Sequence, residues 1–76
     1  MNRFQHRAAA LWYIARRDGK LLTGIRARHV GADRVTWGGP PGIPFPNRRA
    51  AEDAIEVYFG SRRAAAELLG AHVKRA

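Results

Sequence analysis

The sequence predicts a small α+β domain: a β-hairpin and a short third strand form an antiparallel sheet, and two C-terminal helices pack on one face of it. Asp18-Gly19 separates two apolar segments, which is the strongest short-range signal of a hairpin. Two stretches after residue 47 then repeat apolar residues at helical spacing, each behind a capping residue. The segment 38–46, which lies between the hairpin and these two stretches, holds all four prolines. Strands followed by helices in this order favour an α+β arrangement.

The hairpin is expected over residues 11–28. With Asp18 and Gly19 as a two-residue turn, Ile14 pairs with Thr23, and alternation divides the side chains between two faces. The inward face then holds Trp12, Ile14, Leu21, Thr23 and Ile25. The outward face holds Leu11, Tyr13, Arg17, Lys20, Arg26 and Arg28. We expect the first set to form the core and the second set, one aromatic ring among four cations, to face a partner.

Residues 34–37 are predicted to form the third strand, and the segment GGPPGIPFP at 38–46 a loop. Proline lacks an amide donor and glycine weakens regular structure, so neither strand nor helix suits this segment. A loop of this length in so small a domain favours a functional role. The alternative is that Ile43 and Phe45 only fill the bottom of the core.

Two helices follow the loop. Asn47 is a suitable N-cap, and one helical face then presents Ala51, Ala54, Ile55 and Tyr58. Ser61 begins a second helix, which Gly70 either ends or weakens. The inward side chains of this second helix are expected to be Ala65, Leu68, Leu69 and Val73.

Length and composition favour one marginally stable domain. A chain of 76 residues buries only about 60% of its unfolded surface, and it has no cysteine for a disulfide or a thiolate metal site. Docking on a partner, or forming a homodimer, is one way to complete such a core. Residues 1–8 are expected to be a flexible basic arm.

No membrane association is expected from the apolar segments. The longest apolar run, 8–15, is well short of the ~20 residues that a membrane span needs. Charged residues 16–18 follow it at once, instead of the small residues of a signal-peptide cleavage site. We therefore expect a soluble, cytoplasmic protein.

The strongest compositional signal is positive charge. The formal net charge is +8, and all but two of the 14 basic residues are arginine, spread along the whole chain. Arginine offers a planar fork of donors that suits phosphate, so nucleic acid or a nucleic-acid-containing complex is the expected partner. The expected contact residues are Tyr13, Arg17, Lys20, Arg26 and Arg28. Tyr13 would also offer a ring on which an unpaired base can stack.

The residues for catalysis are scarce. Ser61 is the only serine, no nucleophile motif surrounds it, and the three histidines lie far apart in the sequence. Glu52 and Glu56 are one helical turn apart and close enough to share a metal, but neighbouring arginines favour ion pairs instead. We expect no enzyme, no catalytic metal and no cofactor. A nuclease that uses His29 beside Arg28 is the minor alternative.

One resemblance is to the Nudix hydrolases. The segment ARRDGKLLTGIRARH, then Trp37, Pro40-Pro41-Gly42 and an alanine-rich helix ending at Gly60, is similar to the first half of that family. Gly42 matches the glycine that opens the family's metal-binding motif. The metal-binding acidic positions, however, are occupied by Asp53-Ala54 and Val57-Tyr58. The resemblance therefore implies a degenerate remnant that lacks the metal ligands.

A second resemblance is to small proteins of bacteriophages and mobile elements. A hairpin, a third strand and a helix carrying Phe45, Arg48, Ala50 and Asp53 are similar to the arm-type DNA-binding domain of tyrosine recombinases. In that domain the sheet enters the major groove, which implies that the outward hairpin face reads nucleic acid. The same pattern resembles compact anti-CRISPR proteins. That likeness implies the alternative function, a phage-encoded anti-defence inhibitor of a protein or ribonucleoprotein target.

Overall fold

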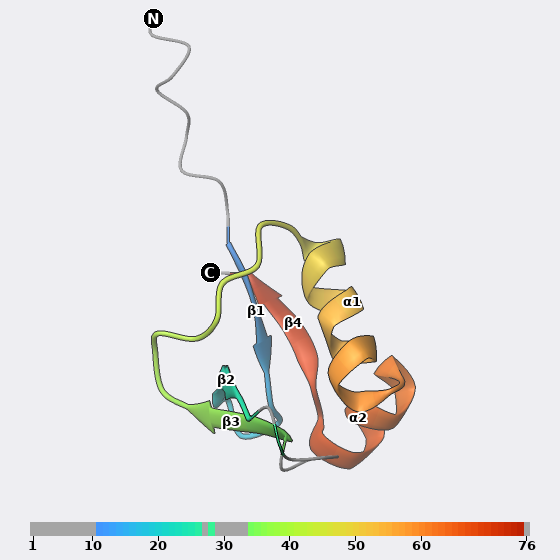
Figure 1. Cartoon of the computed structure of the whole chain (residues 1–76). Coiled ribbons are helices and arrows are strands. Elements are labelled where there is room, and N and C mark those ends of the chain that lie inside the picture. Colours follow the sequence, from blue (N-terminus) through green and yellow to red (C-terminus); the bar gives the residue numbers. More distant parts are fainter. Residues whose placement is uncertain (1–10, 27, 29–33, 76) are drawn as a thin grey trace, which may run out of the picture.

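The described part of the chain, in a computed structural model, comprises residues 11–26, 28 and 34–75. It contains four strands and two helices in the order β1 (Trp12–Ala15), β2 (Leu21–Ile25), β3 (Val35–Gly38), α1 (Arg48–Phe59), α2 (Arg62–Leu69) and β4 (His72–Arg75). The strands form one antiparallel sheet in the order β3-β2-β1-β4, and the helices lie together on one side of it (Figure 1). The predicted α+β class is confirmed, as is the third strand. The predicted flexible arm at 1–8 lies outside the described residues.

The fourth strand was not predicted from the sequence. Gly70, in the left-handed region at φ 65°, ends α2 and donates its N–H to the carbonyl of Ala66 at 3.0 Å. The chain then turns back antiparallel to β1, so that Val73 lies opposite Ile14. Val73 therefore belongs to the sheet edge, and its predicted place on the second helix is wrong.

The hairpin turn has three residues, 17–19, instead of two. Ala15 pairs with Leu21, and the Arg16 N–H donates to the Lys20 carbonyl at 2.8 Å. Gly19 adopts φ 88° and its N–H donates to the Arg16 carbonyl at 2.9 Å, as in a three-residue turn that ends in a left-handed glycine. The predicted register is wrong by one residue, and such a slip exchanges the two faces of a strand.

The register decides which leucine enters the core. Leu22 and Ile14 are both 0% exposed, whereas Leu21 lies on the other side of the sheet beside Tyr13. Ile25 is 46% exposed, and β2 has an irregular register between Leu22 and Gly24 that breaks its alternation. The inward prediction is thus confirmed for Trp12 and Ile14, which contact the core, and wrong for Leu21 and Ile25.

The helices begin where the sequence predicts. The side chain of Asn47 accepts from the Ala50 N–H at 2.8 Å, and that of Ser61 from the Ala64 N–H at 3.2 Å. The predicted inward face of α1 is confirmed, since its residues are buried or half-buried against the core: Ala51, Ala54, Ile55 and Tyr58. On α2, Ala65 is buried, but Leu68 is 79% exposed and was wrongly placed inward.

The proline-rich loop is part of the sheet's hydrogen bonding. β1 and β2 pair beside the turn and then part, and segment 43–45 fills the gap between them. Ile43 donates its N–H to the Leu22 carbonyl at 2.9 Å, while Phe45 and Trp12 exchange two backbone hydrogen bonds at 2.8 and 3.0 Å. Ile43 and Phe45 also pack against the core, as the structural alternative predicted. In Figure 1 this loop runs from β3 past β1 to the start of α1.

The observed register makes a testable prediction about the two adjacent leucines. Leu22→Ala should lower the free energy of unfolding by about 2–5 kcal/mol, because it removes a fully buried side chain from a tightly packed core. Leu21→Ala, the matched control on the other side of β2, should cost much less. Urea unfolding followed by circular dichroism measures both variants. A larger loss of unfolding free energy for Leu21→Ala than for Leu22→Ala would contradict the observed register and favour the two-residue turn.

Candidate nucleic-acid interface

The five predicted contact residues do not share one surface. Lys20 and Arg26 line one hollow, and Tyr13 lines another. Arg17 lies against the end of α2. Arg28 is exposed, and the residues on both sides of it lie outside the described ranges. The prediction of a single outward hairpin face is therefore wrong. The three-residue turn shifts the register of β2 against β1 by one residue, so Tyr13 and Lys20 lie on opposite faces of the sheet.

The first hollow, which we term the cationic hollow, lies where the hairpin turn approaches α2. Its volume is about 430 Å³, and it is lined by Arg16, Lys20, Arg26, Val35, Thr36, Trp37 and Leu69. The Arg16 guanidinium lies 5.4 Å from the centroid of the Trp37 ring. That ring is itself stacked on Phe59, with centroids 6.2 Å apart. The hollow thus has an aromatic floor fixed by packing and three cations around it.

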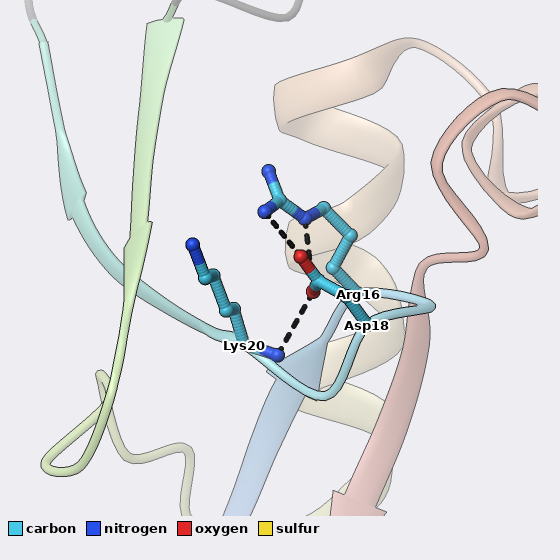
Figure 2. Close-up of polar contacts among 3 residues, drawn as sticks. All are labelled: Arg16, Asp18 and Lys20. Carbon is cyan, nitrogen blue, oxygen red and sulfur yellow. Dashed lines mark hydrogen bonds and ion pairs between the residues drawn. The ribbon is translucent and has the colours of Figure 1, made fainter.

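One carboxylate, that of Asp18, organises the turn beside this hollow. It accepts hydrogen bonds from the side chain of Arg16 at 2.6 and 3.1 Å and from the backbone N–H of Lys20 at 3.0 Å (Figure 2). The Arg16 hydrogen bond is the main reason that the pKa of Asp18 falls to about 2, and the Lys20 N–H adds to the effect. The same pair raises the pKa of Arg16.

The other two cations of the hollow differ from Arg16 in their contacts. Among the described residues, neither the Lys20 ammonium nor the Arg26 guanidinium forms an ion pair with a carboxylate. Asp18 forms an ion pair with Arg16 and has only a longer-range attraction to the Lys20 ammonium. The cationic hollow therefore holds three cations against one carboxylate, next to an aromatic ring, which suits an anionic ligand.

The second hollow, termed the tyrosine hollow, lies on the sheet face opposite the helices. It measures about 410 Å³ and is lined by Tyr13, Leu21, Pro40, Pro41, Gly42, Lys74 and Arg75. Tyr13 is half-buried and pairs with Lys74 across β1 and β4. A Cβ at Gly42 would lie 2.9 Å from the Leu21 Cβ, so only glycine lets the loop approach the sheet this closely. Lys74 and Arg75 were not among the predicted contacts, because β4 was not predicted.

Arg17 has a structural role. Its backbone N–H donates to the Leu69 carbonyl at 3.1 Å, and its guanidinium donates to the Glu67 carbonyl at 3.4 Å. Gly70 lies so close that a Cβ there would be 2.5 Å from the Arg17 Cβ. Because the last carbonyls of a helix lack partners within the helix, Arg17 ties the hairpin turn to the end of α2.

Glu52 and Glu56 are ion-paired, as the sequence predicts. Glu52 lies 3.5 Å from Arg48 and 3.1 Å from Arg62, and Arg62 also approaches Glu56 at 3.5 Å. Arg62 therefore links α1 to α2. The described residues contain no group of three or more His, Cys, Asp or Glu side chains that could hold a metal ion.

Comparisons with other proteins give no family for this chain: no protein-family model, curated protein or solved structure matches it. The resemblances drawn from the sequence therefore stay predictions. None of the helices in the described residues has the length and apolar character that crossing a membrane requires.

The Asp18 contacts predict how stability depends on pH. A carboxyl with a pKa of about 2 in the folded protein and 3.8 as its ordinary value stabilises the fold above about pH 4, and this contribution disappears as the pH falls through 2. Asp18→Asn should therefore be less stable than the natural protein at pH 5, and the difference should shrink by pH 2.

Urea unfolding at the two pH values measures this difference, and an NMR titration of the Asp18 carboxyl gives its midpoint directly. The effect should be small and should diminish in high salt, because the pair is exposed to solvent. A carboxyl midpoint near 4 would contradict the assignment.

Proposed function

We propose that this protein is a non-enzymatic nucleic-acid-binding protein whose cationic hollow contacts the phosphate backbone. The observation that carries the proposal is the convergence of Arg16, Lys20 and Arg26 around one hollow, with Asp18 as the only carboxylate bound to any of them among the described residues. Guanidinium and ammonium groups donate to phosphate oxygens, and release of condensed counterions supplies much of the affinity of such contacts.

The charge of the whole chain supports the same function. A net charge of +8 produces a long-range field that speeds association with a polyanion. The field alone gives no defined contact, however. The hollow supplies one, because it gathers three cations, and Arg16 among them is held by Asp18 and lies against the Trp37 ring.

The test of this proposal is the double charge reversal Lys20→Glu/Arg26→Glu. Binding to labelled DNA and RNA, measured by fluorescence anisotropy over a salt series, should be lost or weakened by tenfold or more. The salt slope is the slope of the log binding constant against the log salt concentration. The neutral single variants Lys20→Gln and Arg26→Gln should each reduce it by about one, as expected for one phosphate contact. Thermal stability should stay nearly unchanged, because neither side chain pairs with a described carboxylate.

The matched control is Arg49→Glu/Arg63→Glu, which changes the net charge by the same amount on the helices. Both side chains are exposed, and Arg63, 90% exposed, pairs only with Glu67 of the same helix, so its reversal leaves the contact between the helices intact. Arg62 is a poor choice, because its reversal would break the link between α1 and α2. If the control weakens binding as much as the hollow variant, the long-range field alone accounts for binding and the hollow has no specific role.

A second candidate function is an anti-defence inhibitor that binds a protein or ribonucleoprotein target, as in bacteriophages. The observation that favours it is an apolar groove of about 410 Å³ at the ends of α1 and α2. Two large apolar side chains on its borders are strongly exposed, Val57 at 65% and Leu68 at 79%, and exposed apolar patches mark protein interfaces. An absence of binding to naked DNA and RNA at low salt, together with binding to an immunity complex, would favour this function.

A further inference from the structure

The tyrosine hollow has a shape that its surroundings fix. One wall is the sheet, with Tyr13 and Leu21, and the other is the loop segment 40–42. The loop cannot move away freely, because the next residue, Ile43, donates its N–H to the Leu22 carbonyl at 2.9 Å and Phe45 is hydrogen-bonded twice to Trp12. The Gly42 backbone also lies directly against Leu21. The hollow is therefore preformed, as binding pockets usually are.

The chemistry of the lining is divided between apolar surface and positive charge. The walls carry a phenol ring, two proline rings and a leucine, and the cations are Lys74 and Arg75 of β4. Lys74 is the direct partner of Tyr13 across the strands, and no carboxylate is among the lining residues. Neither cation forms an ion pair with a described carboxylate. The volume, about 410 Å³, lies within the range of small-molecule sites.

A ligand that complements this lining is a flat ring with an anionic group attached to it. We infer that the tyrosine hollow receives an unpaired base, with the adjoining phosphates on Lys74 and Arg75, so that the protein prefers single-stranded to double-stranded nucleic acid. This inference rests on the proposed function and specifies its substrate. Stacking on an aromatic ring tolerates any base, because every base has a π-face. A base within a duplex is already stacked and paired, so it cannot enter the hollow without being extruded.

The arrangement of the two hollows also bears on the kind of strand that could occupy both. Lys20 and Leu21 are neighbours in the chain, yet Lys20 lines the cationic hollow and Leu21 the tyrosine hollow. A ligand that contacts both must bend sharply around β2. A duplex has a persistence length of about 150 base pairs and resists such a bend, whereas a single strand follows it easily.

The experiment compares a labelled single strand of about 15 nucleotides, near the upper site size of single-strand binding folds, with the duplex of the same sequence. Tyr13→Ala should weaken binding of the single strand by roughly 5- to 150-fold, the range for losing one stacked base, and leave the duplex within about twofold. Tyr13→Phe keeps the ring and should bind nearly as the natural protein does. Lys74→Gln/Arg75→Gln, on the exposed edge strand, should lower the slope of the log binding constant against log salt for the single strand by about 1.4, about 0.7 for each lost phosphate contact.

Circular dichroism shows whether Tyr13→Ala folds. If Tyr13→Ala does not fold, the variant Lys74→Gln/Arg75→Gln still tests the tyrosine hollow, because both of its side chains are exposed. The inference is overturned if Tyr13→Ala affects both ligands equally, or neither, while Lys20→Glu/Arg26→Glu still abolishes binding. In that case the proposed function stands without it. An unchanged single-strand slope for Lys74→Gln/Arg75→Gln would also overturn it.

A separate measurement distinguishes failure of the proposed function from failure of the inference. A nucleoside monophosphate is titrated while NMR follows the ring protons of Tyr13, which should shift upfield as a base stacks on them. If the natural protein binds neither oligonucleotide, the proposed function fails, and the ring shift alone decides whether the hollow takes a nucleotide. A shift caused by an acidic aromatic peptide but not by the monophosphate would assign the hollow to a protein partner and overturn the inference.

Discussion

The hydrogen bonds of segment 43–45 in the gap between β1 and β2 hold the rest of the structure in place. When two strands diverge, their backbone groups lose partners, and a buried N–H or C=O without a partner costs free energy comparable to a lost hydrogen bond. Here the Leu22 carbonyl and both backbone groups of Trp12 find their partners in the loop. The same bonds fix one wall of the tyrosine hollow and bring the chain to Asn47, where α1 begins.

The small core depends on the close approach of the helices to the sheet as well as on large buried side chains. Within ranges 11–26, 28 and 34–75, only Ile14 and Leu22 are large side chains that are fully buried. The helical partners of the core include Ala51 and Ala65, whose small side chains let the helices lie near the sheet. Arg62, shared between Glu52 and Glu56, then joins the two helices on the outside. Three described acids on the helices, Glu52, Glu56 and Glu67, are in ion pairs. The cations Lys20, Arg26, Lys74 and Arg75 at the two hollows form none with a described carboxylate.

Local signals in the sequence predicted most of the elements, because each has a local physical cause. Asn47 and Ser61 begin helices through a single side-chain hydrogen bond to the backbone, and the pattern that permits this bond is visible within four residues. The turn was mispredicted because a left-handed glycine suits both two- and three-residue turns. The choice depends on the Asp18 carboxylate, which binds the Lys20 N–H and the Arg16 side chain across the longer turn. Leu21 and Leu22 are identical in type, so the hydrophobic pattern carried no information about which one is buried.

The fourth strand was missed for a different reason. His72–Arg75 is an edge strand with three exposed residues out of four, so it lacks the alternation that identifies a strand from sequence. Lysine and other charged residues on the edge strand of a sheet also discourage its pairing with a strand of another chain. Its place beside β1 depends on the left-handed Gly70 and on the contact of that glycine with Arg17, a residue far away in the sequence. No local pattern expresses such a contact, and the cations of the tyrosine hollow were missed with the strand.

The extra turn residue is what divides the candidate interface. In a two-residue turn Tyr13 would share a face with Lys20, as the Asp18-Gly19 pattern predicted. In the observed register Ala15 is opposite Leu21, so Tyr13 and Leu21 share one face and Lys20 turns to the other. One inserted residue therefore places the aromatic ring on the loop side of the sheet and the turn cations on the helix side. The single sheet face that the sequence predicted is thus replaced by two hollows on opposite sides of β2. Under the proposed function, a flexible strand reaches both hollows more readily than a rigid duplex.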